Sequence, residues 1–160
     1  MLKETNRKIG GDFEKYIAGL FPDAGLVRGS GSWMWAKGDV MTDVYCIQCK
    51  YTDKPYYTLK LSELIKSEKE ASQEKKDPLF SIGIGGDGFH TFFVERLSIG
   101  CLNNYKGKLN LVSCNKSIKL TLDMLTDNLF ILFQLNNKEY LYEITNEKTF
   151  IERKEIEGIC

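Results

Sequence analysis

The sequence predicts an α/β fold: a central mixed sheet flanked by helices, with a β-rich extension at the C-terminal end. Segments with the apolar period of a helix alternate with short segments rich in β-branched and aromatic residues. Their order is helix, strand, strand, helix, strand, strand over about residues 7–95, and mainly strand patterns follow over about 96–160. Because no repeat, low-complexity tract or linker interrupts the chain, we expect one domain over 1–160.

Two segments carry the helical period. In residues 9–21 the apolar positions recur every three to four residues, with Asp12 as the expected N-cap. In residues 59–76 the same period returns, with lysines at the end, and Pro78 is the expected stop. The charged side chains of this second segment interleave in sign, which is typical of a solvated face from which lysines could approach DNA.

Strand patterns surround the second helix. Residues 44–51 have strand length and many β-branched and aromatic side chains, and Lys54-Pro55 ends the pattern. Residues 79–84 and 89–94 are two further strands, and the Gly-rich segment 85–88 between them favours a hairpin rather than a dinucleotide loop, since no helix follows it.

The last third of the chain reads mainly as strand. Its expected elements are a strand over 109–114, a short helix over 120–126, and a hairpin of strands 130–135 and 138–144. Asn136-Asn137 is the expected hairpin turn, because asparagine tolerates positive φ. The charged tail from Glu152 is expected to be loose.

Composition limits the function classes. The hydrophobic share of 42% and the charged share of 28% are ordinary for a folded domain. No apolar run reaches the roughly 20 residues that a membrane span needs, and the first residues lack a signal-peptide pattern, so we expect an intracellular, cytoplasmic protein without a membrane partner. A Lys/Asn/Ile-rich composition is typical of A+T-rich genomes, those of phages included.

The formal net charge is zero, with a slightly basic first half and a slightly acidic second half. Proteins that bind DNA irrespective of its sequence usually present a basic face. A nucleic-acid substrate would therefore have to be held by a local patch, a dimer groove or a metal ion.

Five cysteines are present, and Cys46 and Cys49 form a C-x-x-C pair. A structural zinc site needs four ligands, and no second pair of Cys or His follows at a suitable spacing. A redox pair would begin a helix, whereas these residues lie in a strand pattern. We therefore expect buried, reduced thiols in a reducing compartment.

The strand over 44–51 contains two polar residues that its apolar character does not explain. Successive side chains of a strand point to opposite faces, so Gln48 and Lys50 share one face. A buried ammonium group is costly unless it is paired. Lys50 is therefore expected at the edge of a pocket, facing an anion.

Two carboxylates are expected near this face. An antiparallel pairing through residues 41–43 would bring Asp39 beside the strand that carries Gln48. Glu14 lies at the border of the apolar stripe of the first helix, from which it can reach inward. Two carboxylates, an amide oxygen and a lysine could hold Mg²⁺, which prefers oxygen ligands, and could activate or orient a water molecule.

These residues resemble the motif of a known superfamily. The order of helix Glu14, the loop R-G-S-G-S over 28–32, Gly38-Asp39 and a strand with Gln48-Cys49-Lys50 before a helix resembles the PD-(D/E)xK, or restriction-endonuclease-like, nucleases. Within that superfamily it is most similar to archaeal- and phage-type Holliday junction resolvases. The resemblance covers about residues 7–95.

The resemblance implies a homodimeric endonuclease that cuts branched DNA with Mg²⁺, or with Mn²⁺ in its place. By position, Glu14, Asp39 and Gln48 are the implied metal-site residues and Lys50 the catalytic lysine. The loop residues with phosphate-binding roles would be Arg28, Ser30 and Ser32. The sequence departs from the pattern at Gln48, where most members carry Glu, and a neutral amide binds a metal more weakly than a carboxylate.

Two other functions stay open at this point. A restriction- or repair-type nuclease acting on plain duplex DNA would use the same core, and a DNA-binding module of nuclease fold without turnover would explain Gln48. Trp33 and Trp35 could stack on bases, although aromatic residues of this kind favour a role in the core or in a dimer interface. The single histidine, His90, is expected to be structural, which argues against nucleophilic catalysis with a histidine base.

Overall fold

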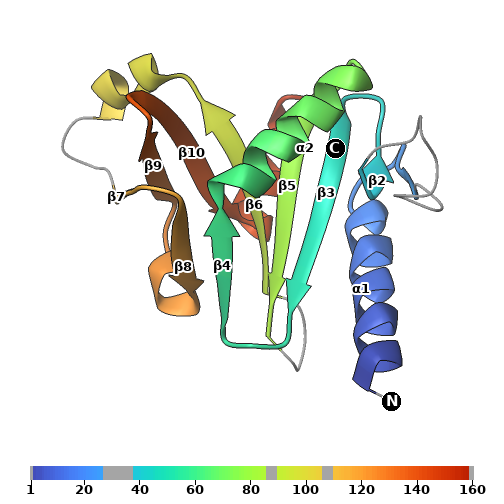
Figure 1. The fold of residues 1–160 in the computed structure, drawn as a ribbon. Helices are drawn as coiled ribbons and strands as arrows, with labels where there is room; N and C mark the ends of the chain where they lie inside the picture. Colours follow the sequence, from blue (N-terminus) through green and yellow to red (C-terminus); the bar gives the residue numbers. More distant parts are fainter. Residues whose placement is uncertain (1, 27–37, 86–89, 106–109, 159–160) are drawn as a thin grey trace.

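Eight strands form one mixed sheet in the computed structural model, which describes residues 2–26, 38–85, 90–105 and 110–158. The strands run across the sheet in the order β1-β2-β3-β5-β6-β10-β9-β7 (Figure 1). Their bounds are Gly25–Leu26 (β1), Val40–Met41 (β2), Tyr45–Thr52 (β3), Asp77–Ile84 (β5), His90–Leu97 (β6), Leu111–Cys114 (β7), Leu129–Leu135 (β9) and Lys138–Asn146 (β10). The pairs β3–β5 and β7–β9 are parallel and the others antiparallel.

A second, two-stranded sheet is formed by β4 (Tyr56–Lys60) and β8 (Ser117–Thr121), which pair antiparallel. The sequence patterns did not indicate either strand as a separate element. Each is only five residues long and has one fully buried side chain, so its apolar signal is weak.

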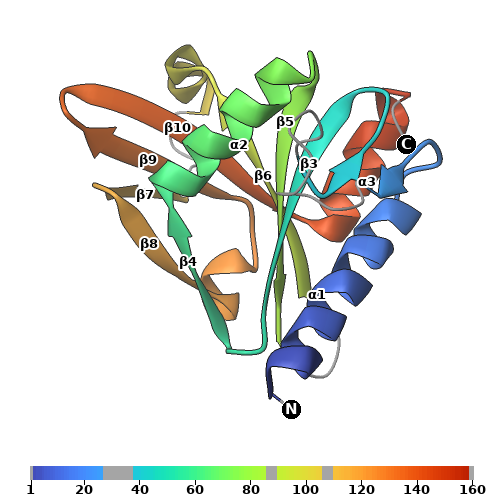
Figure 2. The ribbon, with the colours of Figure 1, turned by 45° about the vertical axis from the view of Figure 1, so that its right-hand side comes forward.

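Helices cover the two faces of the large sheet, as the sequence predicts. α1 (Leu2–Gly19) and α3 (Glu147–Ile156) share the apolar cluster of one face, whereas α2 (Leu61–Gln73) contributes to the cluster of the other (Figures 1 and 2). Two short 3-10 helices, η1 (Ile99–Tyr105) and η2 (Leu122–Leu125), lie in the connections. The predicted mixed sheet flanked by helices is therefore confirmed.

The core consists of two main apolar clusters, one on each face of the sheet. On the first face, Phe13 and Ile17 of α1 pack with Ile47, Leu79 and Phe150. On the second face, α2 and the small β4–β8 sheet pack onto the strands. The buried residues of this cluster include Leu59, Leu61, Leu64, Phe80, Ile82 and Leu120. Since β5 and β6 contribute to both clusters, they are the central strands of the fold.

The first helix begins earlier than predicted. α1 starts at Leu2, so Asp12 lies inside the helix and is not its N-cap. The Gly10-Gly11 pair, which the prediction used as a boundary, is accommodated in the helix interior, where each glycine costs about 1 kcal/mol relative to alanine.

The second helix and the hairpins follow the predictions more closely. α2 ends at Gln73, before Pro78, because Lys75 adopts a left-handed φ of 56° and Lys76 N–H returns to the carbonyl of Ala71. Asn136 and Asn137 both have positive φ and form the β9–β10 turn, which is confirmed. The β5–β6 hairpin is confirmed by its pairing, while residues 86–89 of its connection lie outside the described residues.

The C-terminal part does not form a separate layer. β10 pairs with β6 of the N-terminal part from Leu141↔Leu97 to Asn146↔Phe92, so the large sheet runs through both parts. The β-rich character predicted for residues 96–160 is confirmed, and its strands extend the central sheet instead of standing apart from it.

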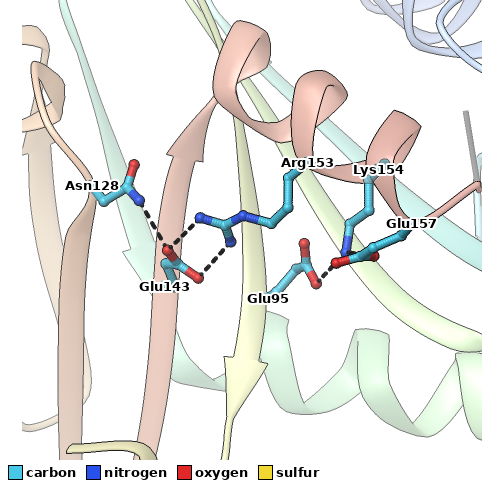
Figure 3. A network of polar contacts seen from close by, with 6 residues as sticks. All are labelled: Glu95, Asn128, Glu143, Arg153, Lys154 and Glu157. Carbon is cyan, nitrogen blue, oxygen red and sulfur yellow. Dashed lines mark hydrogen bonds and ion pairs between the residues drawn. The ribbon is translucent and has the colours of Figure 1, made fainter. Parts of the chain in front are cut away.

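The tail predicted to be loose is a helix held by ion pairs. Asn146 caps α3, accepting a hydrogen bond from Thr149 N–H at 2.9 Å. Arg153 donates to both oxygens of buried Glu143 at 3.0 and 3.2 Å (Figure 3). Lys154, which is also buried, lies 3.3 Å from the carboxylate of Glu95. A charged tail looks solvated in a sequence, but here its charges are the contacts that fix the helix on the sheet.

Candidate functional site

The two faces of β3 have the predicted separation of side chains. Ile47 and Cys49 pack in the apolar cluster beneath α1. Gln48 and Lys50 point to the opposite face, where both line a cavity next to α2. Both residues are partly exposed, so the amide and the ammonium group reach the surface rather than the core.

Asp39 is held next to β3 by its backbone and its side chain. Its N–H donates to the carbonyl of Ile47 at 2.9 Å. Its Oδ2 accepts two hydrogen bonds, from Cys49 N–H at 2.8 Å and from Nε2 of Gln48 at 2.6 Å. The predicted convergence of Asp39 and Gln48 through an antiparallel β2–β3 pair is therefore what the structure shows.

Gly38 makes this approach of Asp39 possible. Its φ is +81°, a backbone conformation that residues with a side chain rarely adopt. A Cβ atom at this position would lie 2.7 Å from Sγ of Cys46. The backbone conformation therefore requires glycine at position 38. Asp39, which follows it, is not only a turn residue, because its side chain accepts hydrogen bonds from β3.

Glu14 lies close enough to Asp39 to interact with it electrostatically. Burial raises the pKa of Glu14 above its ordinary value, and the negative charge of Asp39 raises the pKa further. The same two carboxylates raise the pKa of the Cys49 thiol, for which burial is the largest cause. Glu14 is therefore half-buried and within electrostatic range of Asp39, and it does not stand alone on the solvent face of α1.

The cavity beside Gln48 and Lys50 has a volume of about 130 Å³. Its other walls come from α2 and β5, through Glu63, Lys66, Ser67 and Phe80. Glu63 accepts a hydrogen bond from the hydroxyl of Tyr57 at 2.9 Å, which fixes the carboxylate at this wall. The charge pattern of the sequence placed Glu63 and Lys66 on a solvated helix face; only the position of α2 over β3 and β5 brings them to the cavity.

Lys50 forms no ion pair with a carboxylate within the part of the chain that the structure describes. Lys66 at the same cavity lies 3.9 Å from Glu70, a loose contact on the surface of α2. The cavity therefore presents two ammonium groups and one carboxylate to solvent beside the amide of Gln48.

The predicted phosphate-binding loop lies outside the described residues. Arg28, Ser30, Ser32 and the two tryptophans, Trp33 and Trp35, all fall in the segment 27–37. Their predicted roles stay predictions.

Among the remaining candidates of the sequence, the two cysteines of the C-x-x-C pair behave as structural residues. Cys46 and Cys49 are buried, free thiols on a strand, as predicted. Burial raises the pKa of the Cys46 thiol to about 11, with nearby carboxylates adding to the effect, so this thiol is protonated at neutral pH and is a poor nucleophile. His90 is exposed at the first residue of β6.

The donor set at Asp39 is compatible with a hard divalent cation. Glu14 and Asp39 offer carboxylate oxygens, and their mutual repulsion is a local cost that a cation would offset. Over residues 2–26, 38–85, 90–105 and 110–158, no group of three or more His, Cys, Asp or Glu side chains is arranged to hold a metal. A third protein donor would have to be the amide oxygen of Gln48.

No helix among the described residues is long and apolar enough to span a bilayer. No family model matches the sequence, and no curated protein matches it. Among solved structures, the chain is similar to the Holliday junction resolvase Hjc of the archaeal hyperthermophile Archaeoglobus fulgidus, with 14% identity and a TM-score of 0.43. The match covers 72% of this chain and 85% of the resolvase. These values do not place the chain in a family.

Proposed function

We propose that the protein is a metal-dependent DNA endonuclease that hydrolyses phosphodiester bonds at the site formed by Glu14, Asp39, Gln48 and Lys50. The observation that supports it most is the contact between Asp39 and Gln48, with Lys50 two residues further along the same face of β3. It is the arrangement expected from the motif, although the four site residues come from three separate segments of the chain.

The chain's own residues have distinct tasks in this proposal. Asp39, fixed by Cys49 N–H and Gln48, and Glu14, fixed by α1, would hold Mg²⁺ or Mn²⁺. The bound cation would polarise a phosphate oxygen and lower the pKa of a water molecule. Lys50 would orient the attacking water and offset the negative charge that builds up on the phosphate.

The substrate is proposed to be branched DNA, cut by a homodimer. This proposal rests on the resemblance of residues 28–32 to the loop of junction resolvases. In this chain, Arg28, Ser30 and Ser32 would contact the phosphate backbone of the DNA. The test is cleavage of a four-way junction, a three-way junction and a linear duplex of matched arms in Mg²⁺. Preferential cutting of the junctions supports a resolvase, whereas equal cutting of all three supports a nuclease for duplex DNA.

A non-catalytic DNA-binding module is the second candidate, and one observation favours it. Gln48 directs its Nε2 to Asp39, so in this arrangement it stabilises the carboxylate and does not present its amide oxygen on that side. Junction binding by the wild type without cleavage in Mg²⁺ or Mn²⁺, and unchanged binding by Lys50→Ala, would support this candidate. Cleavage that is lost in Lys50→Ala would exclude it.

A further inference from the structure

The small β4–β8 sheet has one buried and one exposed face. Tyr57, Leu59, Ile118 and Leu120 point into the second apolar cluster. The register of the two strands places six residues on the outer face, and none of them is acidic: Tyr56, Thr58, Lys60, Ser117, Lys119 and Thr121. Lys60 and Lys119 are diagonal neighbours on this face, because Thr58 pairs with Lys119 and Lys60 pairs with Ser117.

Lys60 occupies a position that a lysine does not favour. It is the N-cap of α2, with φ −109° and ψ 133°, and its side chain makes no capping hydrogen bond. Ser, Thr, Asp or Asn would satisfy a backbone N–H of the first turn, and the positive end of the helix dipole repels a cation. Lys60 is therefore a less stabilising N-cap for α2 than any of these residues would be.

The ring of Tyr56 holds the ammonium group of Lys119, the diagonal neighbour of Lys60. Nζ of Lys119 lies 4.1 Å from the ring centroid of Tyr56, and Nζ of Lys54 lies 5.7 Å from the same centroid. Two ammonium groups on one ring repel each other, but each is attracted to the π electrons. Tyr56 thus concentrates positive charge on the outer face. We call the surface formed by Lys54, Lys60 and Lys119 around Tyr56 the lysine face.

The charge of the lysine face is not neutralised within the chain. Across residues 2–26, 38–85, 90–105 and 110–158, no carboxylate forms an ion pair with Lys54, Lys60 or Lys119. The chain as a whole has no net charge, so this is a local excess. Lys60 leads directly into the first turn of α2, whose Glu63 lines the cavity with Lys50, so α2 connects the lysine face to the candidate site.

We propose that the lysine face binds the phosphate backbone of duplex DNA next to the candidate site. The inference rests on the proposed function, since it concerns how the same substrate is held. An outer sheet face that carries exposed lysines and no acidic residue complements a run of phosphates and reads no base edge. It supplies the local basic patch that a DNA-binding protein of zero net charge requires.

The experiment measures binding of a fluorescein-labelled DNA duplex in EDTA, so that no cleavage occurs, at several salt concentrations. The variant is Lys60→Ser combined with Lys119→Gln. The matched control is Lys138→Gln combined with Lys148→Gln, which changes two exposed lysines, one at the start of β10 and one in α3. For the variant we expect a Kd about tenfold higher in 0.1 M salt, and a salt slope smaller by about 2. The control should bind like the wild type.

Stability separates this effect from misfolding. Because serine caps α2 better than lysine, Lys60→Ser alone should raise Tm while it weakens DNA binding. Unchanged affinity and salt slope in the double variant would overturn the inference, as would an equal loss in the control.

The outcomes for the inference and for the nuclease are distinguishable. If the wild type binds DNA through these lysines but does not cut it, the result supports DNA binding by the lysine face and contradicts the proposed nuclease activity. If the wild type cuts DNA and the double variant binds and cuts it equally well, the result contradicts DNA binding by the lysine face and leaves the proposed nuclease activity supported. A wild type that binds no DNA overturns both.

Discussion

Gln48 donates a 2.6 Å hydrogen bond from Nε2 to Oδ2 of Asp39, an oxygen that also accepts from Cys49 N–H. A glutamate in place of Gln48 could not make this bond, because two ionised carboxylates would face each other. The amide of Gln48 therefore stabilises Asp39 when no cation is bound. A glutamate at this position would instead add a negative charge that attracts a cation. The neutral Gln48, which hydrogen-bonds Asp39 where the motif has a charged glutamate, is the feature that distinguishes this site from the motif it resembles.

The first prediction concerns Gln48→Glu. Without metal, the lost hydrogen bond and the added repulsion should lower the free energy of unfolding by about 1–3 kcal/mol. With Mg²⁺, the third carboxylate should strengthen binding, so the variant should gain more stability from Mg²⁺ than the wild type does. Chemical unfolding in EDTA and in a Mg²⁺ series measures both effects. Equal stability of the two proteins in EDTA would contradict the structural role given to the amide.

The second prediction is a pH dependence at Glu14. Burial and the charge of Asp39 raise the pKa of the folded carboxyl above the ordinary 4.5, so ionised Glu14 is disfavoured in the folded state. The stability that the protonated Glu14 carboxyl provides, measured as the free energy of unfolding, is fully present below pH 4.5. It is lost as the pH rises through the pKa that Glu14 has in the folded state. Glu14→Gln should therefore have a higher Tm than the wild type at pH 7 in EDTA, and the difference should vanish below pH 4.5.

Glu152→Gln is the control for the Glu14 prediction, because Glu152 is an exposed carboxylate on α3. It should leave the Tm profile unchanged between acid and neutral pH. A Glu14→Gln protein with the wild-type profile would show that Glu14 does not approach Asp39.

The third prediction compares two glycines. A Cβ atom on Gly83 of β5 would lie 2.7 Å from the ring of Phe13, so the strand and α1 can pack closely only because a side chain is missing there. Gly83→Ala should lower the free energy of unfolding by about 1–3 kcal/mol. Gly10→Ala in α1 meets nothing within 4 Å and should raise it by about 0.5–1 kcal/mol. Denaturant midpoints that move in the same direction for both variants would contradict this packing.

The fourth prediction concerns the ion pairs of α3. Arg153→Met leaves buried Glu143 without its two hydrogen bonds from the guanidinium, while the hydrogen bond from Asn128 at 3.1 Å remains (Figure 3). We expect a loss of about 2 kcal/mol, since an unpaired carboxylate is then buried. Adding Glu143→Gln should recover part of the loss, because the charge is removed. Additive losses in the double variant, measured by denaturant unfolding, would contradict a direct pairing.

Much of the sheet and of the site could be predicted from the sequence, because local patterns carry the information. The alternation of β3 predicts which face carries Gln48 and Lys50, and the short connection from Asp39 to β3 leaves little choice but an antiparallel pair. Asn136-Asn137 predicts its turn through backbone chemistry alone.

The rest depends on contacts between distant segments. Glu63 reaches the cavity only because α2 packs over β3 and β5, and the charged end of α3 is held on the sheet because Glu143 and Glu95 of other strands pair with its cations. β4 and β8 pair across more than 50 residues, and neither has a sufficient pattern of its own. Gly10-Gly11 misled the prediction of the first helix start, since packing outweighs the intrinsic propensity of two glycines.

The measurement that tests the central claim most directly is cleavage of a labelled four-way junction by the wild type and by Asp39→Asn, in Mg²⁺ and in EDTA. Unfolding of both proteins is measured alongside to show that each is folded. The account predicts cleavage by the wild type in Mg²⁺ alone and a loss of at least about 100-fold in Asp39→Asn. Cleavage by Asp39→Asn at the wild-type rate, or no cleavage of any DNA by the folded wild type, would contradict it.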